Sequence, residues 1–270
     1  MRGGQWQVLR LIEGLAGEGV ESTLLAVSGS PLFETARRGG WRVEPIGWTG
    51  TLLRAPAHDL VHAHEARGHT FGLFARRPLV VSRRVSFPIR WRWKYARPAR
   101  FLAVSEFVKS VLAAGGVPAG KIAVVYDGVP LLAQSHGSRV IAVRKDGVAP
   151  ELDLPAAQRL ETELPEAAML VYLTASEGLG SGALLAMSAG VPVIASRVGG
   201  LPEVVRHRET GLLVENTAES ISAAIRELTE DRALARRLGE AGRRAVSERF
   251  TVSHMARRTM EVYRHVLSHV

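Results

Sequence analysis

One glycine-rich stretch, Met169–Val205, constrains the fold more than any other part of this chain. Its first six residues, Met169–Thr174, form an apolar run with the length of a strand buried on both faces. The turn SEGLGSG follows, and then come a short helix-forming run and a second strand-like run, Val191–Ser196. A helix that starts among these glycines would direct free N–H groups and the positive end of its dipole at whatever lies above the strand. The stretch therefore predicts either a phosphate site with one carboxylate, Glu177, beside it or a βα turn that binds nothing.

Strands and helices alternate along the rest of the chain. Short branched runs such as Leu79–Ser82, Phe101–Ser105 and Ile122–Tyr126 are typical of strands, and amphipathic or capped helices separate them. This alternation predicts an α/β protein with mainly parallel sheets. The polar, irregular run 130–165 interrupts it, so we expect an amino-terminal domain at 1–130 and a carboxy-terminal domain at 131–270. The last amphipathic helix, near Val252–His269, is expected to pack back across the protein.

Composition limits the classes of function. The chain has 270 residues, 46% of them hydrophobic, which is enough for two domains with cores of their own. It contains no cysteine, which excludes disulfides and thiolate metal sites. No run approaches the roughly 18 apolar residues that cross a bilayer, and MRGGQWQ lacks the apolar core of a signal peptide, so we expect a cytoplasmic protein. The formal charge of +9 indicates an anionic partner.

The run SEGLGSGALLAMSAGVPVIASRVGGLPEVV, followed by TGLLV, resembles the carboxy-terminal signature of the group 1, family 4 retaining glycosyltransferases. Weaker matches precede it in the family's order: a glycine pair before the first helix, then DLVHAH, FLAVSEFVKSVL and VVYDGVP. The resemblance implies the GT-B architecture, in which two Rossmann-like lobes face each other across a cleft. It also implies transfer of a hexosyl or N-acetylhexosaminyl group, with retention and without a metal or other cofactor. The donor would be a UDP- or GDP-linked sugar bound by the carboxy-terminal lobe, and the acceptor a glycan or lipid-linked molecule.

The same resemblance assigns roles to particular residues. Glu177 matches the first glutamate of the family's spaced pair, which contacts the donor sugar. The glycine turn after it matches the segment whose amides receive the diphosphate, and stabilising that leaving group is the physical core of the reaction. Catalysis is expected from Glu177, His64 and Arg84. The donor site is expected to comprise Gly3, Gly4, Glu177, Gly178, Leu179, Gly180, Ser181, Gly182 and Leu185.

Three departures from the family's pattern leave two alternatives, an enzyme with turnover and a binding protein without it. Leu185 occupies the position of the second glutamate, which normally holds the ribose, and a leucine side chain accepts no hydrogen bond. The basic pair that normally clamps the diphosphate has no clear match, and Arg144 and Lys145 are the nearest candidates. Arg83 and Arg84 stand where the family usually has a histidine. A protein that binds sugar nucleotides or a membrane surface without turnover is therefore the alternative, and a sugar-nucleotide epimerase is a weaker one.

The run HAHEARGH contains His62, His64, Glu65 and His69. Residues two apart on a strand point to the same side, so the first two imidazoles could share a metal ion. The glutamate and the third histidine lie in a loop and helix without fixed geometry, so we expect no metal site. The histidines either line the acceptor side, at the carboxyl end of a strand, or have a structural role.

The most basic and aromatic segment of the chain is RWRWKY at residues 90–95. Tryptophans among cations suit a membrane interface with anionic lipid, although they can also cover a domain with stacked side chains. Single-stranded nucleic acid could stack on the same rings, but no recognisable nucleic-acid module surrounds them, and we expect no such partner. We expect peripheral contact with the inner face of the membrane. The acceptor or membrane side is assigned to Arg83, Arg90, Trp91 and Trp93.

Overall fold

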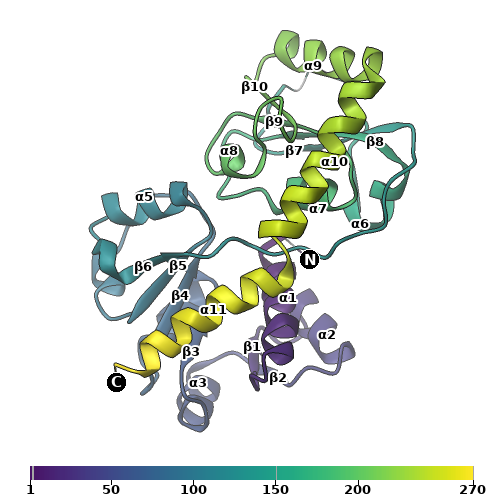
Figure 1. Ribbon diagram of the computed structural model, residues 1–270. Coiled ribbons are helices and arrows are strands. Elements are labelled where there is room, and N and C mark those ends of the chain that lie inside the picture. Colours follow the sequence, from purple (N-terminus) through teal and green to yellow (C-terminus); the bar gives the residue numbers. More distant parts are fainter. Residues whose placement is uncertain (2, 150, 270) are drawn as a thin grey trace. The chain divides into compact units, whose positions relative to one another are not determined.

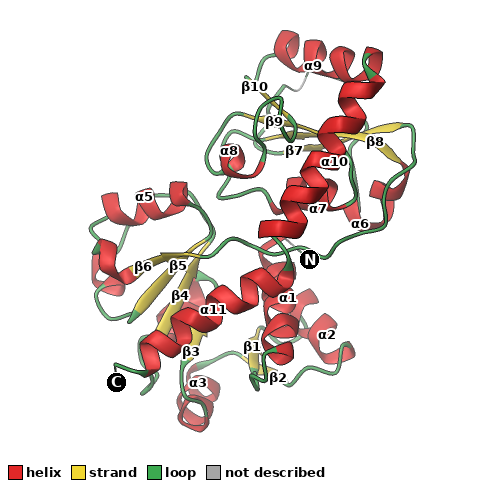
Figure 2. Ribbon diagram, in the orientation of Figure 1, coloured by secondary structure: helices red, strands yellow, loops and turns green. Residues whose placement is uncertain are grey.

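The computed structural model describes residues 1, 3–149 and 151–269. The chain divides into two compact α/β units, Met1–Gly128 together with Val252–Val270, and Val129–Thr251 (Figure 1, Figure 2). The sequence predicted domains at 1–130 and 131–270, with a last helix that packs back across the protein, whereas the structure groups residues 252–270 with the first unit. That helix, α11, belongs to the first unit, where it packs against α1 and β5.

The first unit contains six short strands, which are all paired in parallel. β1 pairs with β2, and the other four form a sheet in the order β3-β4-β5-β6. The elements of this unit are α1 (Gly3–Gly17), β1 (Leu24–Ala26), α2 (Pro31–Arg38), β2 (Val43–Pro45), α3 (Trp48–Arg54), β3 (Val61–Ala63), α4 (Ala66–Gly72), β4 (Leu79–Arg83), the 3-10 helix η2 (Arg92–Tyr95), β5 (Arg100–Ala103), α5 (Glu106–Ala114), β6 (Ile122–Val124) and α11 (Val252–Leu267).

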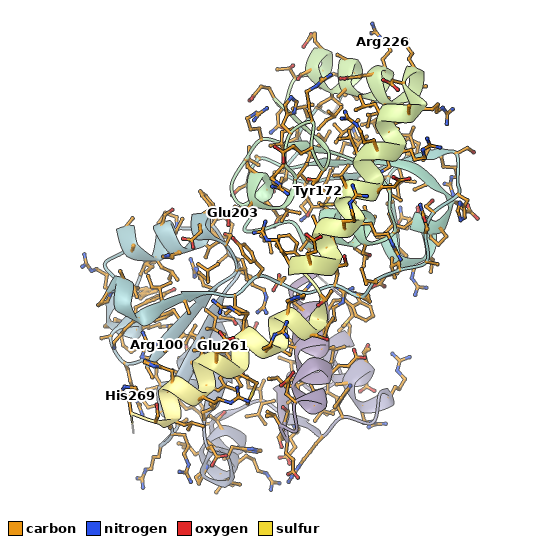
Figure 3. All side chains as sticks on the ribbon, viewed as in Figure 1. Arg100, Tyr172, Glu203, Arg226, Glu261 and His269 are labelled. Atoms are coloured by element: carbon orange, nitrogen blue, oxygen red, sulfur yellow. The ribbon has the colours of Figure 1, made fainter. Side chains whose placement is uncertain are left out.

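Alternate residues of β4 and β5 point to opposite faces of this sheet. Val80 and Leu102 face α1 and α11, and together they form a core cluster that includes Tyr263. Phe101 points to the other face, where the ring of Tyr95 stacks on it at 5.4 Å. The guanidinium of Arg100 on β5 also contacts His265 on α11 (Figure 3). The sheet is therefore covered on both faces, as the alternation of strands and helices requires.

Helix α3 was not expected from the sequence. Its run WTGTLLR contains a glycine and two threonines, which are weak helix formers. Packing contacts stabilise the helix instead. The ring of Trp48 lies edge-on to Phe71 at 4.8 Å and to Phe74 at 5.0 Å. Contacts with α4 and the residues after it therefore stabilise α3.

The second unit contains one parallel sheet in the order β10-β9-β8-β7. The two buried strands and the helix expected in the glycine-rich stretch are confirmed as β8, β9 and α7. The core lies between the sheet and α9 with the start of α10, and includes Met169, Val171, Leu173, Ile194, Ile221 and Leu238. The elements are β7 (Arg139–Arg144), α6 (Leu160–Glu163), β8 (Ala167–Leu173), α7 (Ser181–Ser188), β9 (Val193–Ser196), α8 (Leu201–Val204), β10 (Leu212–Val214), α9 (Ala218–Glu230) and α10 (Arg232–Arg249).

Within the described ranges, every helix is too short or too polar to cross a bilayer.

Candidate functional site

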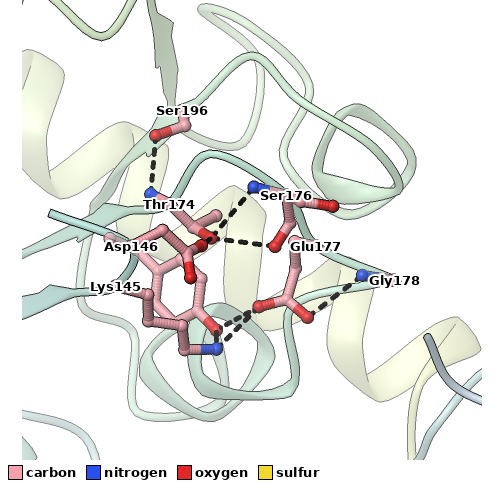
Figure 4. Close-up of polar contacts among 8 residues, drawn as sticks. Lys145, Asp146, Thr174, Ser176, Glu177, Gly178 and Ser196 are labelled. Carbon is pink, nitrogen blue, oxygen red and sulfur yellow. Dashed lines mark hydrogen bonds and ion pairs between the residues drawn. The ribbon is translucent and has the colours of Figure 1, made fainter. Parts of the chain in front are cut away.

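Polar side chains from the carboxyl ends of neighbouring strands meet in the second unit (Figure 4). Thr174, which follows β8, connects them. Its N–H donates to Ser196 Oγ at the end of β9 (3.0 Å), and its Oγ1 donates to Asp146 Oδ2 beyond β7 (2.9 Å). The side-chain amide of Asn216, beyond β10, donates to Thr174 O at 3.0 Å. These bonds hold the ends of four strands together beneath the glycine-rich turn.

The carboxylate of Glu177 is the most heavily engaged group of this site. Its Oε2 accepts from Lys145 Nζ at 2.8 Å and from Tyr172 OH at 2.7 Å, and its Oε1 accepts from the N–H of Gly178 at 3.1 Å. Lys145 Nζ also lies 2.6 Å from Tyr172 OH. The Glu177 side chain is 17% exposed, whereas Lys145 is 45% exposed and can reach a ligand. Burial, and then the charge of Glu177, raise the pKa of Tyr172 well above its ordinary value, so the phenol stays a donor.

Helix α7 begins directly beyond this carboxylate. Gly180 precedes the helix with φ 104°, a left-handed conformation that only glycine adopts readily, and no side chain caps the helix. The first turn closes with the bond from Leu184 N–H to Gly180 O (3.1 Å), so the N–H groups before Leu184 have no acceptor within the helix. Their position and the helix dipole suit an anion.

The second glycine turn fixes the first through backbone contacts. The N–H of Gly200 donates to Glu177 O at 3.1 Å. A Cβ added at Gly200 would lie 2.1 Å from Gly178 O, and one added at Gly199 would lie 2.1 Å from Glu177 O. Both glycines are therefore needed for the close approach that positions Glu177.

We expect Gly200→Ala to displace this turn, to destabilise the second unit by about 2 kcal/mol and to weaken nucleotide binding. Calorimetric melting and titration with UDP and GDP measure both effects. Gly17→Ala is the matched control, because an added Cβ there meets nothing within 4 Å. Wild-type melting and binding by Gly200→Ala would contradict the positioning role of this glycine.

Leu185 lies on the buried side of α7 and is 4% exposed. Leu179, which is 2% exposed, is equally covered. The apolar side chain of Leu185 is buried, so almost none of its surface is accessible to a ligand. A ribose would need other partners.

In the first unit, the residues around Arg84 converge at the carboxyl ends of β3, β4 and β6. Arg84 Nε donates to Asp127 Oδ1 at 2.9 Å, and Arg84 Nη1 lies 3.1 Å from His64 Nδ1. The position of a Cβ added at Gly4, in the first turn of α1, lies 4.0 Å from Arg84 Cδ. The side chains of Arg84 and Asp127 are only 13% and 8% exposed. Three residues assigned from the sequence, Gly4, His64 and Arg84, therefore lie together, with Asp127 as a partner that the sequence analysis missed.

The two strand histidines are held in the neutral form. His62 Nδ1 lies 2.6 Å from Tyr263 OH on α11, and His62 Nε2 lies 2.8 Å from Ser82 Oγ. Burial, and then the charge of Arg84, lower the pKa of His62 to about 3. Burial also lowers the pKa of His64, with further contributions from His62 and Arg84. Neutral His64 can accept a hydrogen bond from the guanidinium of Arg84.

His62 and His69 already have partners within the protein. Both ring nitrogens of His62 already contact side chains of the protein, and His69 Nε2 lies 2.9 Å from Lys94 O. Glu65 is exposed at the start of α4. In the part of the chain that the structure describes, no three histidine or acidic side chains are grouped as metal ligands.

The buried His62 makes the first unit sensitive to acid. Between the ordinary histidine pKa of 6.5 and the folded value of about 3, the unfolded chain binds a proton that the folded chain does not, so stability falls as the pH falls. From about pH 7 to about pH 5 the loss should reach about 2 kcal/mol. Urea unfolding followed by tryptophan fluorescence measures this unit alone, because all five tryptophans lie in it. We expect a shallower pH dependence for His62→Gln, whereas the same substitution at exposed His269, in the same unit, should leave it unchanged.

The basic, aromatic segment lies beyond β4. Arg83 turns away from Arg84 and donates from Nη1 to Tyr95 OH at 3.1 Å and from Nη2 to Phe87 O. Arg90 is exposed, and Trp91 and Trp93 are 61% and 59% exposed. Arg83 therefore anchors this segment to the end of β4, while the tryptophans face solvent.

Comparison with known proteins places both parts of the chain in one family. The model of glycosyltransferase family 4 matches residues 1–131, and that of the group 1 glycosyl transferases matches residues 154–245. An alpha-maltose-1-phosphate synthase from Mycolicibacterium smegmatis is 35% identical over 146 residues, which are 51% of this chain and 38% of that protein. A GDP-mannose-dependent alpha-(1-6)-phosphatidylinositol monomannoside mannosyltransferase from Mycobacterium tuberculosis is 40% identical over 89 residues, 33% of this chain and 23% of that protein. These matches span less than half the length of either relative.

Solved structures agree on the fold. Anabaena HepE, crystallised in complex with UDP and glucose, has a TM-score of 0.82 and 15% sequence identity, over 98% of this chain and 96% of that one. At this identity the likeness shows the fold alone, which is the GT-B fold with a Rossmann-like arrangement in each unit. The family models match both units, so this chain belongs to the group 1, family 4 glycosyltransferases.

Proposed function

We propose that this chain transfers a sugar from a UDP- or GDP-linked donor, with retention, to a glycan or lipid-linked acceptor. The observation that supports this most is the position of Glu177 beside the uncapped start of α7, at the carboxyl ends of a parallel sheet. Ligands of such folds bind at this edge. The N–H groups of α7 would receive the diphosphate, and the carboxylate would accept hydrogen bonds from sugar hydroxyls. The complex of HepE with UDP and glucose and the GDP-mannose dependence of the mycobacterial relative support a donor of this class.

Lys145 would supply the positive charge of the donor site. The family's basic pair has no clear match in this chain, while the exposed end of Lys145 lies 2.8 Å from Glu177. An ammonium on a flexible stem can leave the carboxylate for a phosphate oxygen, which stabilises the leaving diphosphate. Tyr172 would then continue to orient Glu177 through its 2.7 Å hydrogen bond.

In the first unit, His64 and Arg84 would contact the acceptor. Arg84 is held by Asp127 and His64, so its orientation is set before any ligand binds. We further propose that the protein works in the cytoplasm, against the inner face of a membrane, because basic and aromatic residues follow Arg84 directly.

A protein that binds sugar nucleotides without turnover is the second candidate. The buried Leu185 favours it, since no carboxylate at that position can hold a ribose.

Release of nucleoside diphosphate from a panel of UDP- and GDP-sugars separates the two candidates. We expect release that depends on an added glycan or membrane-lipid acceptor. Binding of UDP or GDP without any acceptor-dependent release would instead support the binding protein.

A further inference from the structure

Exposed apolar side chains are concentrated on one part of the first unit. Of the twelve large hydrophobic residues exposed among those that the structure describes, eight lie between residues 48 and 93. Exposed apolar side chains gathered in one region mark sites of interaction. We call this surface the aromatic face and define it by its six most exposed members, which are Trp48 (50%), Leu53 (75%), Phe74 (48%), Phe87 (66%), Trp91 (61%) and Trp93 (59%).

Helix α4 joins the parts of the aromatic face. On one side of it, Trp48 of α3 packs on Phe71 and Phe74. On the other side, Lys94 of η2 donates from Nζ to Thr70 Oγ1 at 2.9 Å, and its carbonyl lies 2.9 Å from His69 Nε2. Helix α3, helix α4 and η2 therefore form one layer. This layer covers the face of the sheet that carries Phe101, opposite the face that packs against α1 and α11.

The segment of the chain that contains this layer is strongly basic. Residues 48–97 contain ten lysines and arginines but only two acids, Asp59 and Glu65. Arg90 and Arg92 are exposed next to the tryptophans, and Arg76 and Arg77 are exposed beside Phe74. The partner of this face must therefore combine negative charge with an apolar interior.

We propose that the aromatic face docks the protein on an anionic lipid membrane. Tryptophan rings settle at the depth of the headgroups, and arginines beside them meet anionic lipid. Leu53, the most exposed member, has no flat ring on which a nucleic-acid base could stack, but it can enter the acyl region. A second copy of the chain would bring like charges together. A membrane satisfies both the charge and the apolar surface.

The docking surface is connected directly to the proposed acceptor side. Arg83, at the end of β4, donates to Tyr95 OH and to Phe87 O, and its neighbour Arg84 contacts His64. A lipid-linked acceptor in the same membrane would lie next to these residues. That last step rests on the proposed function, whereas docking does not.

Co-sedimentation with vesicles tests the docking without any sugar nucleotide. We expect the wild-type chain to bind vesicles of phosphatidylcholine and phosphatidylglycerol at least about tenfold more tightly than phosphatidylcholine alone, and added salt should weaken this binding. Leu53→Glu, and separately Trp91→Ser with Trp93→Ser, should each lower the affinity by at least about tenfold. Leu267→Glu is the matched control, because this exposed leucine lies on α11 at the opposite face, and it should bind like the wild type.

Several results would overturn the proposal. They are equal binding to both kinds of vesicle, unchanged binding by Leu53→Glu, tight binding to single-stranded DNA but not to vesicles, and a dimer that Leu53→Glu dissociates while vesicles stay unbound. Titration of the same variants with UDP and GDP keeps the two proposals apart. Vesicle binding without binding of either nucleotide would leave the docking intact and contradict the proposed donor site. The reverse result would contradict the docking and the proposed membrane location, but not sugar transfer.

Discussion

Glu177→Gln is expected to lower sugar transfer by about 100- to 1000-fold, which is the effect of removing one preorganised charged contact from an active site. The substitution keeps the size of the side chain but replaces the carboxylate with a neutral amide. The carboxylate lies 2.8 Å from Lys145 Nζ and accepts a hydrogen bond from Tyr172 OH at 2.7 Å. The amides at the start of α7 are untouched, so affinity for UDP or GDP should change by less than about tenfold. Turnover with the best donor of the panel and titration with its nucleoside diphosphate measure the two quantities.

Glu227→Gln is the matched control for this substitution. Glu227 lies on α9 of the same unit, where its carboxylate pairs with Arg208 at 2.7 Å. We expect its variant to retain most of the wild-type turnover. Equal turnover by Glu177→Gln and the wild type would show that this carboxylate has no part in transfer.

Asp127→Ala is expected to destabilise the first unit by about 3 kcal/mol, because it leaves the guanidinium of Arg84 mostly buried without its counter-charge. Tryptophan fluorescence during urea unfolding reports on this unit alone. The double variant Arg84→Met, Asp127→Leu should regain much of the loss, since two apolar side chains leave no buried charge.

The two variants also separate stability from function. If Asp127→Ala were as stable as the wild type, the ion pair would contribute nothing to folding, contrary to its burial. A stable double variant that has lost transfer would support a direct role for Arg84.

The fold could be predicted further than the site. The α/β class and the strands on either side of the glycine turn follow from apolar runs of strand length, and the structure confirms them as β8 and β9. Helix α3 could not be predicted, because its residues are weak helix formers and the contacts of Trp48 with α4 decide its conformation. The amphipathic pattern predicted that the last helix packs back across the protein, but it could not show that α11 contacts α1 and β5.

Only those site residues that form a local sequence pattern could be predicted. Glu177 beside glycines could be singled out, because a carboxylate next to a helix start is a local pattern. Lys145 was only a loose candidate for the basic pair, and neither Tyr172 nor Asp127 was singled out. The partners of Lys145 and Asp127 are 32 and 43 residues away and come together only when parallel strands align their ends. A polar residue directly after each buried strand is the one signal that could have drawn attention to Lys145 and Asp127.

The central claim is that the second unit binds a nucleoside diphosphate at the start of α7, next to Lys145. Isothermal titration with UDP and GDP tests it most directly, with Lys145→Met as the variant and Arg139→Met as its control. Arg139 is the first residue of β7, the strand that Lys145 follows. Its exposed ion pair with Glu166 lies at the end of β7 opposite to Lys145. We expect the wild type and Arg139→Met to bind at least one of the two nucleotides, and Lys145→Met to bind it at least about tenfold more weakly. Absence of binding to both nucleotides by the wild type, or equal binding by Lys145→Met, would contradict the claim.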